Sequence, residues 1–409
     1  MRTNARAKLS KRSLTRPCKN KAEVFEMEAM LERGCGLDVH KDKIEACIMI
    51  NTTPEIEVIR ERFGSTAAEL KRLSKWIEDQ QVKNVAMEST GVYWMPIYEA
   101  LESNIGERID ILVANAYHMK NVPGRKTDVK DAQWIAELLL KGLLEHSYVP
   151  NRYMRDVREI SRARRKLIRE RVREWNHVEK YLQAHGIKLT SVLSSITCVT
   201  AQEIIKVFAE KGEITQEELR RCRRGTLKHS EEEMYEALCV KLTKTEQRML
   251  KYHMTHIEQL DQDELELNEM LSEMMADCGE EIDIAVSIPG ISTDSAIEIF
   301  AEIGVVPQDH FQTKERLCKW AGLSPRNSES AGNISNRKTL HGNPYIKSIL
   351  VQCAWAAVKC RKSQLNDWFW RKQSVIGRKK AIVAVARKLL ALLYTLLEKR
   401  ECYKPVITA

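Results

Sequence analysis

Four acidic residues stand in positions where a lone charge is costly or where two charges share one helix face. Asp38 interrupts an apolar strand pattern, and Glu88 ends another. Asp128 and Asp131 are three residues apart at the start of a helical pattern, so both project from one face of that helix. Because charged residues are rare within strands unless they pair or bind metal, this set predicts a shared acidic site.

Such a site suits chemistry on a phosphodiester bond. Transfer or hydrolysis at phosphate uses two divalent cations about 4 Å apart, and Mg²⁺ prefers carboxylate and water oxygens. We therefore predict an Mg²⁺ site at these four carboxylates, with Mn²⁺ as an alternative ion. Arg125 and Lys126, just upstream of Asp128, would contact a phosphate near the metals. N-terminal helix capping is the alternative explanation of the pair Asp128 and Asp131.

The elements that would position these acids follow an alternating pattern. Strands are predicted at 35–50, 56–63, 82–87 and 109–113, and helices at 66–79, 92–102 and 128–144. This alternation indicates an α/β layer architecture with a mixed sheet.

The rest of the chain is predicted to be helical. Long helices rich in Glu, Lys, Arg and Leu fill 149–280, and 281–409 is helical with turns at Pro289-Gly290 and Gly342-Asn343-Pro344. Within the first of these segments an imperfect coiled-coil seam is formed by Met249, Met254, Ile257, Leu260, Leu265, Leu267 and Met270. Its expected use is dimerisation or spacing. The predicted organisation is a basic leader (1–33), an α/β domain (34–148), a helical linker (149–280) and a C-terminal module (281–409).

Positive charge is concentrated in two places. The first 22 residues hold eight basic and no acidic residues, against a net charge of +9 for the chain, which indicates either a phosphate-binding arm or a solvated tail. A second block at 152–173 places arginines at three- and four-residue steps, which predicts one basic helix stripe that contacts nucleic acid. The stripe is formed by Arg155, Arg158, Arg162, Arg165 and Arg169. A solvated helix face is the alternative.

Composition argues against several other classes of protein. The eleven cysteines include no Cys-x-x-Cys pair, and there is no secretory signal, which favours reduced thiols in a cytoplasmic protein. An uninterrupted apolar run long enough to span a membrane is absent from the sequence, so no membrane partner is expected. The phosphate-binding pattern of ATPases is also absent, which leaves ATP-driven chemistry unsupported.

Four motifs of the α/β segment resemble one family. They are Gly36-Leu-Asp-Val-His-Lys-Asp42, Ala86-Met-Glu-Ser-Thr-Gly-Val-Tyr93, Ala114-Asn115 and Lys126-Thr-Asp-Val-Lys-Asp-Ala132. They look like the RuvC-like DEDD domain of insertion-sequence family one-ten transposases, which are bridge-RNA-guided serine recombinases. The resemblance implies a ribonuclease-H-like fold with the metal site at Asp38, Glu88, Asp128 and Asp131.

The C-terminal module resembles the second part of the same transposases from its Pro289-Gly290 turn onward. That turn is similar to a helix-hairpin-helix, which would aim backbone N–H groups at a phosphate; a plain tight turn is the alternative. The resemblance further implies that Ser330 is the nucleophile, with Ser328 as the nearby alternative. Arg326, Arg337 and Lys338 would neutralise the DNA phosphates around it.

Together these observations predict a DNA transposase that cuts and rejoins DNA with Mg²⁺ and a serine nucleophile. The resemblance implies donor and target DNA, a non-coding bridge RNA and a homo-oligomer, dimer or tetramer, as partners, in the bacterial or archaeal cytoplasm near the nucleoid. Two alternatives stay open: a metal-dependent junction-resolving nuclease without a covalent intermediate, and a non-catalytic nucleic-acid-binding scaffold.

Overall fold

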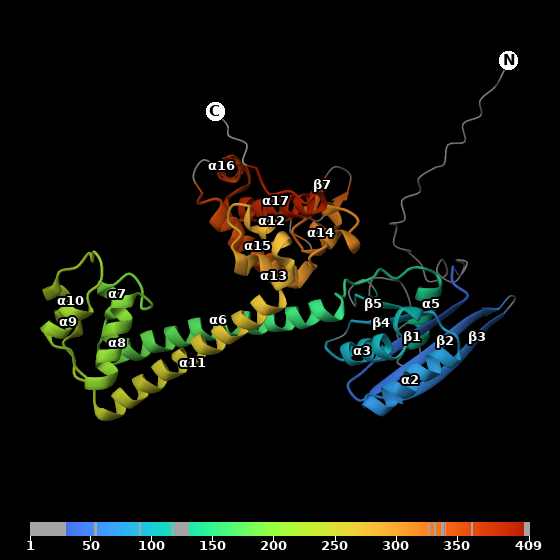
Figure 1. Cartoon of the computed structure of the whole chain (residues 1–409), viewed down its shortest axis with the longest axis horizontal. Coiled ribbons are helices and arrows are strands. Elements are labelled where there is room, and N and C mark those ends of the chain that lie inside the picture. The colour runs from blue at the N-terminus through green and yellow to red at the C-terminus, as the bar shows by residue number, and fades with distance from the viewer. Residues whose placement is uncertain are drawn as a thin grey trace, which may run out of the picture. The chain divides into compact units, whose positions relative to one another are not determined.

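The chain divides into two compact units, with the boundary between Val149 and Pro150 (Figure 1). The computed structural model describes residues 30–52, 55–89, 91–115, 119, 131–325, 328–330, 333–336, 339, 341–360 and 363–404. Residues 1–29, most of the predicted basic leader, lie outside the described residues.

The first unit is built on a five-stranded mixed sheet. Its strands are β1 (Arg33–Val39), β2 (Lys43–Thr52), β3 (Glu55–Gly64), β4 (Asn84–Glu88) and β5 (Asp110–Ala114), in the order β3-β2-β1-β4-β5. The three strands β1 to β3 pair antiparallel, whereas β4 runs parallel to β1 and β5 runs parallel to β4. The α/β class and the mixed sheet are confirmed, and the sheet is consistent with a ribonuclease-H-like domain.

Helices cover both faces of this sheet (Figure 1). They are α2 (Ala67–Asp79), α3 (Trp94–Asn104) and α5 (Asp131–Leu140), with the short 3₁₀ turn η1 (Gly106–Arg108) before β5. Cys35, Leu37 and Val39 pack with α2 and α3 into one buried cluster. Because side chains alternate along a strand, the residues between them face α5. The acidic residue of β1, Asp38, therefore lies on the α5 face of the sheet.

The single strand expected over 35–50 is instead two antiparallel strands. The chain turns between Val39 and Lys43, and the N–H of His40 donates to the carbonyl of Lys43 at 3.0 Å. The expectation was wrong because apolar alternation continues on both sides of a short polar segment, and three exposed residues suffice to reverse the chain.

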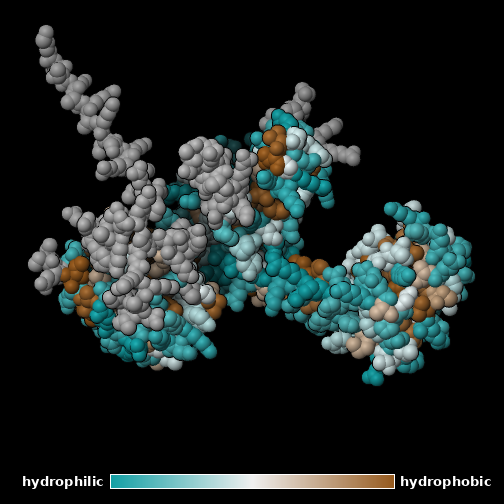
Figure 2. Space-filling view, turned by 180° about the vertical axis from the view of Figure 1, so that it is seen from behind, coloured by the Kyte–Doolittle hydropathy of each residue, from teal (hydrophilic) through white to brown (hydrophobic). Residues whose placement is uncertain are grey.

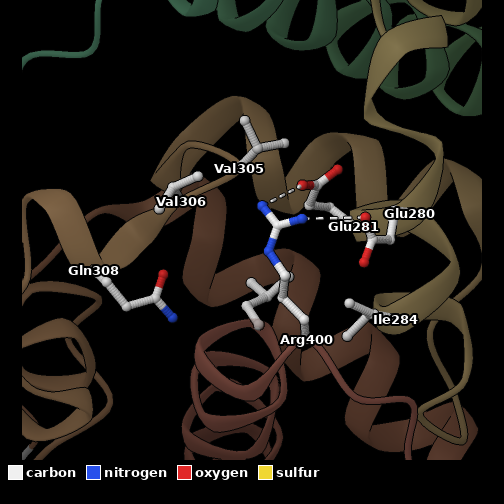
Figure 3. A pocket seen from close by; sticks show the side chains of 8 residues that line it. Glu280, Glu281, Ile284, Val305, Val306, Gln308 and Arg400 are labelled. Atoms are coloured by element: carbon white, nitrogen blue, oxygen red, sulfur yellow. Dashed lines mark hydrogen bonds and ion pairs between the residues drawn. The ribbon is translucent and has the colours of Figure 1, made fainter.

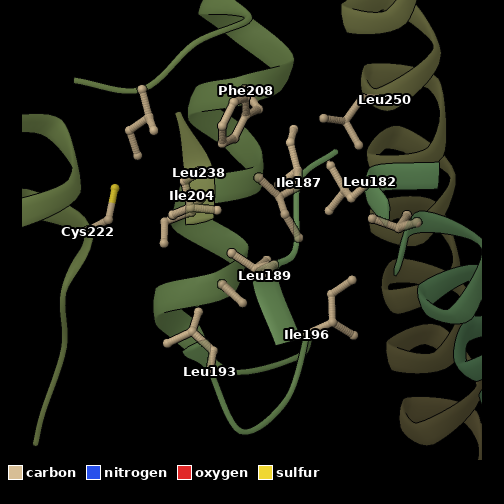
Figure 4. Packing of buried hydrophobic residues seen from close by; sticks show 14 of the residues in the cluster. Leu182, Ile187, Leu189, Leu193, Ile196, Ile204, Phe208, Cys222, Leu238 and Leu250 are labelled. Atoms are coloured by element: carbon tan, nitrogen blue, oxygen red, sulfur yellow. The ribbon is translucent and has the colours of Figure 1, made fainter. Parts of the chain in front are cut away.

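The second unit begins with a pair of long antiparallel helices, α6 (Arg152–Ala184) and α11 (Lys244–Met274). A small helical lobe connects them, formed by α7 (Leu189–Val192), α8 (Val199–Lys211), α9 (Gln216–Cys222) and α10 (Glu231–Leu238). Its core is apolar: Leu182 and Leu250 of the long helices meet Ile187, Ile204 and Phe208 of the lobe (Figure 4). The lobe thus closes the end of the helix pair.

The predicted coiled-coil seam of α11 is divided between two surfaces. Met254, Ile257 and Leu260 are buried, the first two in the cluster that α6 shares, whereas Met249 and Met270 are exposed. On the face seen in Figure 2, the long helices are mostly hydrophilic with separate hydrophobic patches. Part of the apolar pattern therefore serves packing within the chain.

The C-terminal module packs as a helical body around α17. Its elements are η3 (Ala276–Cys278), α12 (Gly279–Val286), α13 (Thr293–Ile303), η4 (Pro307–Asp309), α14 (Lys314–Trp320), the hairpin β6 (Ser328–Ser330) and β7 (Asn333–Asn336), α15 (Pro344–Ala357), α16 (Gln364–Ile376) and α17 (Arg378–Lys399). Leu389, Leu390 and Leu393 of α17 are fully buried, and α17 contacts α12, α14, α15 and α16. The helical character predicted for this part of the chain is confirmed.

The turn between α12 and α13 is held by packing within the module. Gly290 has a φ of +93°, and a Cβ there would lie 2.5 Å from the backbone N of Ala357 and the carbonyl oxygen of Cys353 in α15. Ser292 caps α13 by accepting from the N–H of Ser295 at 3.3 Å. The glycine is thus required by close contact with α15, and a phosphate-binding role for the turn stays a prediction.

Candidate active site: a carboxylate cluster and a serine loop

Two of the predicted metal ligands lie on neighbouring parallel strands. The ladder between β1 and β4 pairs Leu37 with Met87, and Asp38 and Glu88 are the next residue on each strand. Residues at the same level of adjacent parallel strands face the same side of the sheet and are separated by roughly 5 Å. The Asp38 side chain is 16% exposed, so this carboxylate is largely withdrawn from solvent.

Glycine in β1 lets α5 approach this face closely. A Cβ on Gly36 would lie 2.2 Å from the carbonyl oxygen of Ala132 and 2.4 Å from the N of Ala136. No residue other than glycine fits there without displacement of the helix. Asp131, the first residue of α5, precedes Ala132, so this contact places it on the same side of the sheet as Asp38.

Small residues line the sheet beside the two carboxylates. Ala86 of β4 and Ala114 of β5 are buried in one cluster with Ile135 and Leu139 of α5. Ala86 is two residues before Glu88 on the same strand, so Glu88 also faces α5. The sheet and helix therefore direct Asp38, Glu88 and Asp131 to one side of the first unit.

A further acidic residue, absent from the sequence-based predictions, stands beside Asp38. Glu45 of β2 is the direct cross-strand partner of Asp38. Its carboxylate accepts from Arg62 at 2.7 Å and lies 3.5 Å from the Lys43 ammonium. These cations compensate the charge of Glu45, which would otherwise repel the Asp38 carboxylate directly across the strands. Only the turn within 35–50, which the sequence did not reveal, brings Glu45 here.

Asp38 also contacts a histidine. The Nε2 of His40 lies 3.1 Å from Oδ2 of Asp38, and His40 follows on the same strand face at the edge of the turn. The imidazole therefore helps to fix the orientation of the carboxylate.

The described carboxylates offer the type of donor atom that a hard divalent cation binds. They do not supply enough donors close together to hold the ion. Within the described ranges, no three His, Cys, Asp or Glu side chains are close enough to hold a metal ion. Asp128, Arg125 and Lys126 lie outside the described residues. Carboxylate oxygens are nevertheless the donors that Mg²⁺ prefers, so the residue types on this side of the sheet fit the ion.

The predicted nucleophile belongs to the short hairpin of β6 and β7. Ser330 pairs with Asn333 at the hairpin tip, and Ser328 pairs with Asn336 two positions back. The backbone thus places Ser330 next to the turn and Ser328 nearer the base. Arg326, Arg337 and Lys338 lie outside the described residues.

The base of this serine loop is tightly closed. A Cβ on Gly342 would lie 2.2 Å from the N of Gly322, so the two chain segments touch backbone to backbone. Pro325 and Thr339 form an isolated antiparallel bridge, and Lys347 of α15 donates to the Thr339 hydroxyl at 2.8 Å. The chain segments on the two sides of the hairpin are therefore joined at its base.

Asn343 connects the base of the hairpin to a buried glutamate. Its side-chain oxygen caps α15 by accepting from the N–H groups of Tyr345 and Ile346, and its Nδ2 donates to Glu302 at 2.6 Å. Glu302, near the end of α13, is 2% exposed. A buried carboxylate is tolerated only with compensating partners, and these come from α6.

The predicted basic stripe of α6 supplies those partners. Arg162 binds Glu302 through two hydrogen bonds of 2.7 and 2.8 Å, and Arg158 donates to the carbonyls of Ala301 and Glu302. The Nε of Arg158 also lies 3.7 Å from the Glu302 carboxylate. The guanidinium of Arg162 stacks over the Tyr345 ring at 4.1 Å. These two arginines therefore attach α13 and α15 to the long helix.

A second arginine pair strengthens the attachment. Arg165 and Arg164 bind Glu298 at 3.0 and 2.9 Å, and Arg165 also donates to Ser348 of α15. Burial raises the pKa of Glu298 and lowers the pKa of Arg165, while their mutual attraction opposes both shifts. Arg155 donates to the carbonyl of Pro150 at 3.0 Å. Contact of the stripe with nucleic acid stays a prediction, whereas its role in packing is observed.

Two models of transposase families match the sequence of this chain. A transposase model named for a DEDD domain matches residues 35–187, and a model of the transposase IS116/IS110/IS902 family matches residues 283–368. Together they cover more than half of the chain. The protein belongs to the IS110 family of insertion-sequence transposases.

Full-length relatives agree with this assignment. The transposase for insertion sequence element IS1111A from Coxiella burnetii is 24% identical over 384 residues, which cover 90% of each chain. A family 20 transposase from Pseudomonas aeruginosa is 24% identical over 336 residues, which are 78% of this transposase and 86% of the relative.

The first matched region of the transposase contains Asp38, Glu88 and Asp131, and the second contains the serine hairpin. A small cavity of about 50 Å³ lies elsewhere, where Arg400 bridges Glu280 and Glu281 (Figure 3). It is too small for a nucleotide. Within the described residues, none of the helices is sufficiently long and apolar to cross a membrane.

Proposed function

We propose that this transposase cuts and rejoins DNA through a covalent link to Ser330, with divalent cations held by Asp38, Glu88, Asp128 and Asp131. The observation that carries the proposal is that Asp38, Glu88 and the start of α5 lie on one side of the sheet, in a family of insertion-sequence transposases. Mg²⁺, or Mn²⁺ in its place, would supply Lewis-acid stabilisation of the phosphate when bound.

The chemistry is a pair of transesterifications. The Ser330 hydroxyl oxygen forms a bond to phosphorus, and the bond from phosphorus to one sugar oxygen breaks. The serine proton passes to a base or solvent, and the leaving sugar oxygen takes up a proton. A hydroxyl of a second strand then attacks the phosphoserine and restores the serine. Arg326, Arg337 and Lys338 would neutralise the surrounding phosphates.

Activation of the serine links the two parts of the proposal. A serine hydroxyl is a weak nucleophile unless a base or a metal activates it. The proposal therefore requires that the carboxylate site and Ser330 act on the same phosphodiester bond. Contact of Gly322 with Gly342 at the base of the hairpin supports it, because a nucleophile must be held in position.

The proposed partners are donor and target DNA, a non-coding bridge RNA from the element, and further copies of this chain. The RNA follows from the family resemblance, in which base pairing reads the DNA sequence and the protein reads duplex shape. Sequencing the RNA that co-purifies with the protein tests this partner directly.

The experiment that tests the nucleophile uses a plasmid carrying the gene with its natural flanking DNA. After denaturing lysis, we expect wild-type protein to carry covalently attached DNA and the Ser330→Ala variant to carry none and to leave the DNA uncut. Ser328→Ala is the matched control and should keep both activities.

Other outcomes would favour the rival functions. Strand cleavage that persists in Ser330→Ala, without any adduct, would indicate a junction-resolving nuclease that uses water. DNA binding that is unchanged by Asp38→Asn and by chelation of metal, with no cleavage by the wild type, would indicate a non-catalytic scaffold.

A further inference from the structure

The junction of α16 and α17 forms a basic corner that the proposed function does not use. Between Trp370 and Lys380 the chain holds five cationic side chains and no acidic one: Arg371, Lys372, Arg378, Lys379 and Lys380. All five residues are exposed, as are the intervening Val375 and Ile376. Positive charge and apolar surface therefore occur together at this corner.

These cations differ from the arginines of α6 in what they bind. In the described part of the chain, none of the five forms an ion pair with a carboxylate, whereas Arg162, Arg164 and Arg165 all do. Arg371 donates to the backbone carbonyl of Asp367, at 3.4 Å. Like charges crowded without counter-charges repel one another, and a bound polyanion relieves that repulsion.

Tryptophans lie among the cations. The ammonium groups of Lys372 and Lys388 lie 5.8 and 5.4 Å from the ring centroid of Trp368, and the Arg378 guanidinium lies 4.9 Å from that of Trp355. Such contacts hold long side chains in place while their remaining donors face solvent. The corner is thus partly pre-organised.

Trp370 is the exposed member of this group. It is 58% exposed, yet it rests edge-to-face on the buried ring of Phe369, with centroids 5.5 Å apart and an angle of 73°. A large aromatic ring that is fixed at its base and open to solvent is a platform on which an unpaired nucleobase can stack. Bases inside a duplex are already stacked, so the platform favours single strands.

The start of α17 adds phosphate-binding groups. Arg378, Lys379 and Lys380 are its first three residues, and no side chain caps this helix. The first N–H groups of a helix lack backbone partners and carry partial positive charge. They therefore reinforce the charge of the three side chains.

We infer that the corner of α16 and α17 binds single-stranded nucleic acid, with an unpaired base stacked on Trp370 and flanking phosphates on Arg371, Lys372 and Arg378 to Lys380. The inference does not depend on Ser330 as nucleophile. The strand can be DNA or RNA, because both present the same phosphates and stackable bases.

The test measures fluorescence anisotropy of full-length protein with labelled 20-nucleotide strands of mixed sequence: DNA, RNA and duplex DNA. We expect Trp370→Ala to weaken single-strand binding about tenfold and duplex binding less than about twofold. Trp370→Tyr should restore most of the affinity, because it returns a ring. Val199→Ala, which truncates an exposed side chain of the helical lobe, should leave binding unchanged.

Charge is tested separately. The double variant K379E/K380E should lower affinity for every strand and reduce its salt dependence. K244E/K251E changes net charge equally at exposed positions of α11 and should have a much smaller effect. The single strand whose binding depends on Trp370 identifies the ligand as DNA or RNA. Equal affinity of wild type and Trp370→Ala for both single strands, or an equal loss for duplex DNA, would overturn the inference.

Discussion

At the scale of single residues, the candidate site depends on Gly36 as much as on its acidic residues. Asp38 and Glu88 are brought level by the strand register, but Asp131 reaches the same side only because α5 rests on Gly36. The sequence showed the carboxylates by their unusual context. It did not show the purpose of Gly36, because the helix that touches it begins almost a hundred residues later.

Replacement of Gly36 tests this contact. We expect Gly36→Ala to destabilise the protein by about 3 kcal/mol, because the new methyl group would collide with backbone atoms of Ala132 and Ala136. Urea denaturation followed by circular dichroism measures the effect. Gly279→Ala is the matched control: a Cβ there meets nothing within 4 Å, so stability should stay equal or rise slightly. Equal stabilities of the two variants would show that α5 does not lie on β1.

At the scale of elements, the long helix α6 acts as a support for the C-terminal module. Its arginines were predicted to form a basic stripe for nucleic acid, but three of them, Arg158, Arg162 and Arg165, bind groups of α13 and α15. Sequence periodicity places a charge on a face. It cannot reveal that acids about 140 residues away will meet that face.

Glu302 is the centre of this attachment. We expect Glu302→Ala to cost about 2–3 kcal/mol of unfolding free energy, because it removes the buried acceptor that the half-buried Arg162 and Asn343 share. Glu280→Ala removes an exposed carboxylate bound to Arg400 and should cost at most about 1 kcal/mol. Chemical denaturation of both variants measures the difference, and a loss below about 1 kcal/mol for Glu302→Ala would contradict the structural role.

At the scale of the whole molecule, the seam of α11 offers a surface for assembly. Met249, Tyr252 and Met270 are exposed and, at 3.6 residues per turn, fall on one face of the helix, which borders the buried face that contains Leu260 and Ile257. An apolar face left open beside a packed one is what a second copy of the helix could cover. Self-association through this face remains a proposal.

Charge introduced on that face should separate the copies. We expect the double variant Y252E/M270E to weaken self-association at least about tenfold, because two carboxylates would lose water on contact. Val199→Glu, at an exposed position of the lobe, serves as the control and should assemble like the wild type. Sedimentation velocity over a range of concentrations reports the result; unchanged assembly of Y252E/M270E would exclude this surface.

The sequence by itself determined the acidic motifs, the alternation of strands and helices, and the family, because these depend on residue type and local spacing. The tertiary structure decided which groups meet. It turned 35–50 into a hairpin that sets Glu45 against Asp38, and it paired the basic stripe of α6 with the buried Glu302 and the half-buried Glu298. Among the residues that the structure describes, it gave the cations around Trp370 no carboxylate partner. The physical reason is that the free energy of a charge depends on its partners and burial, and both are fixed only when distant segments pack together.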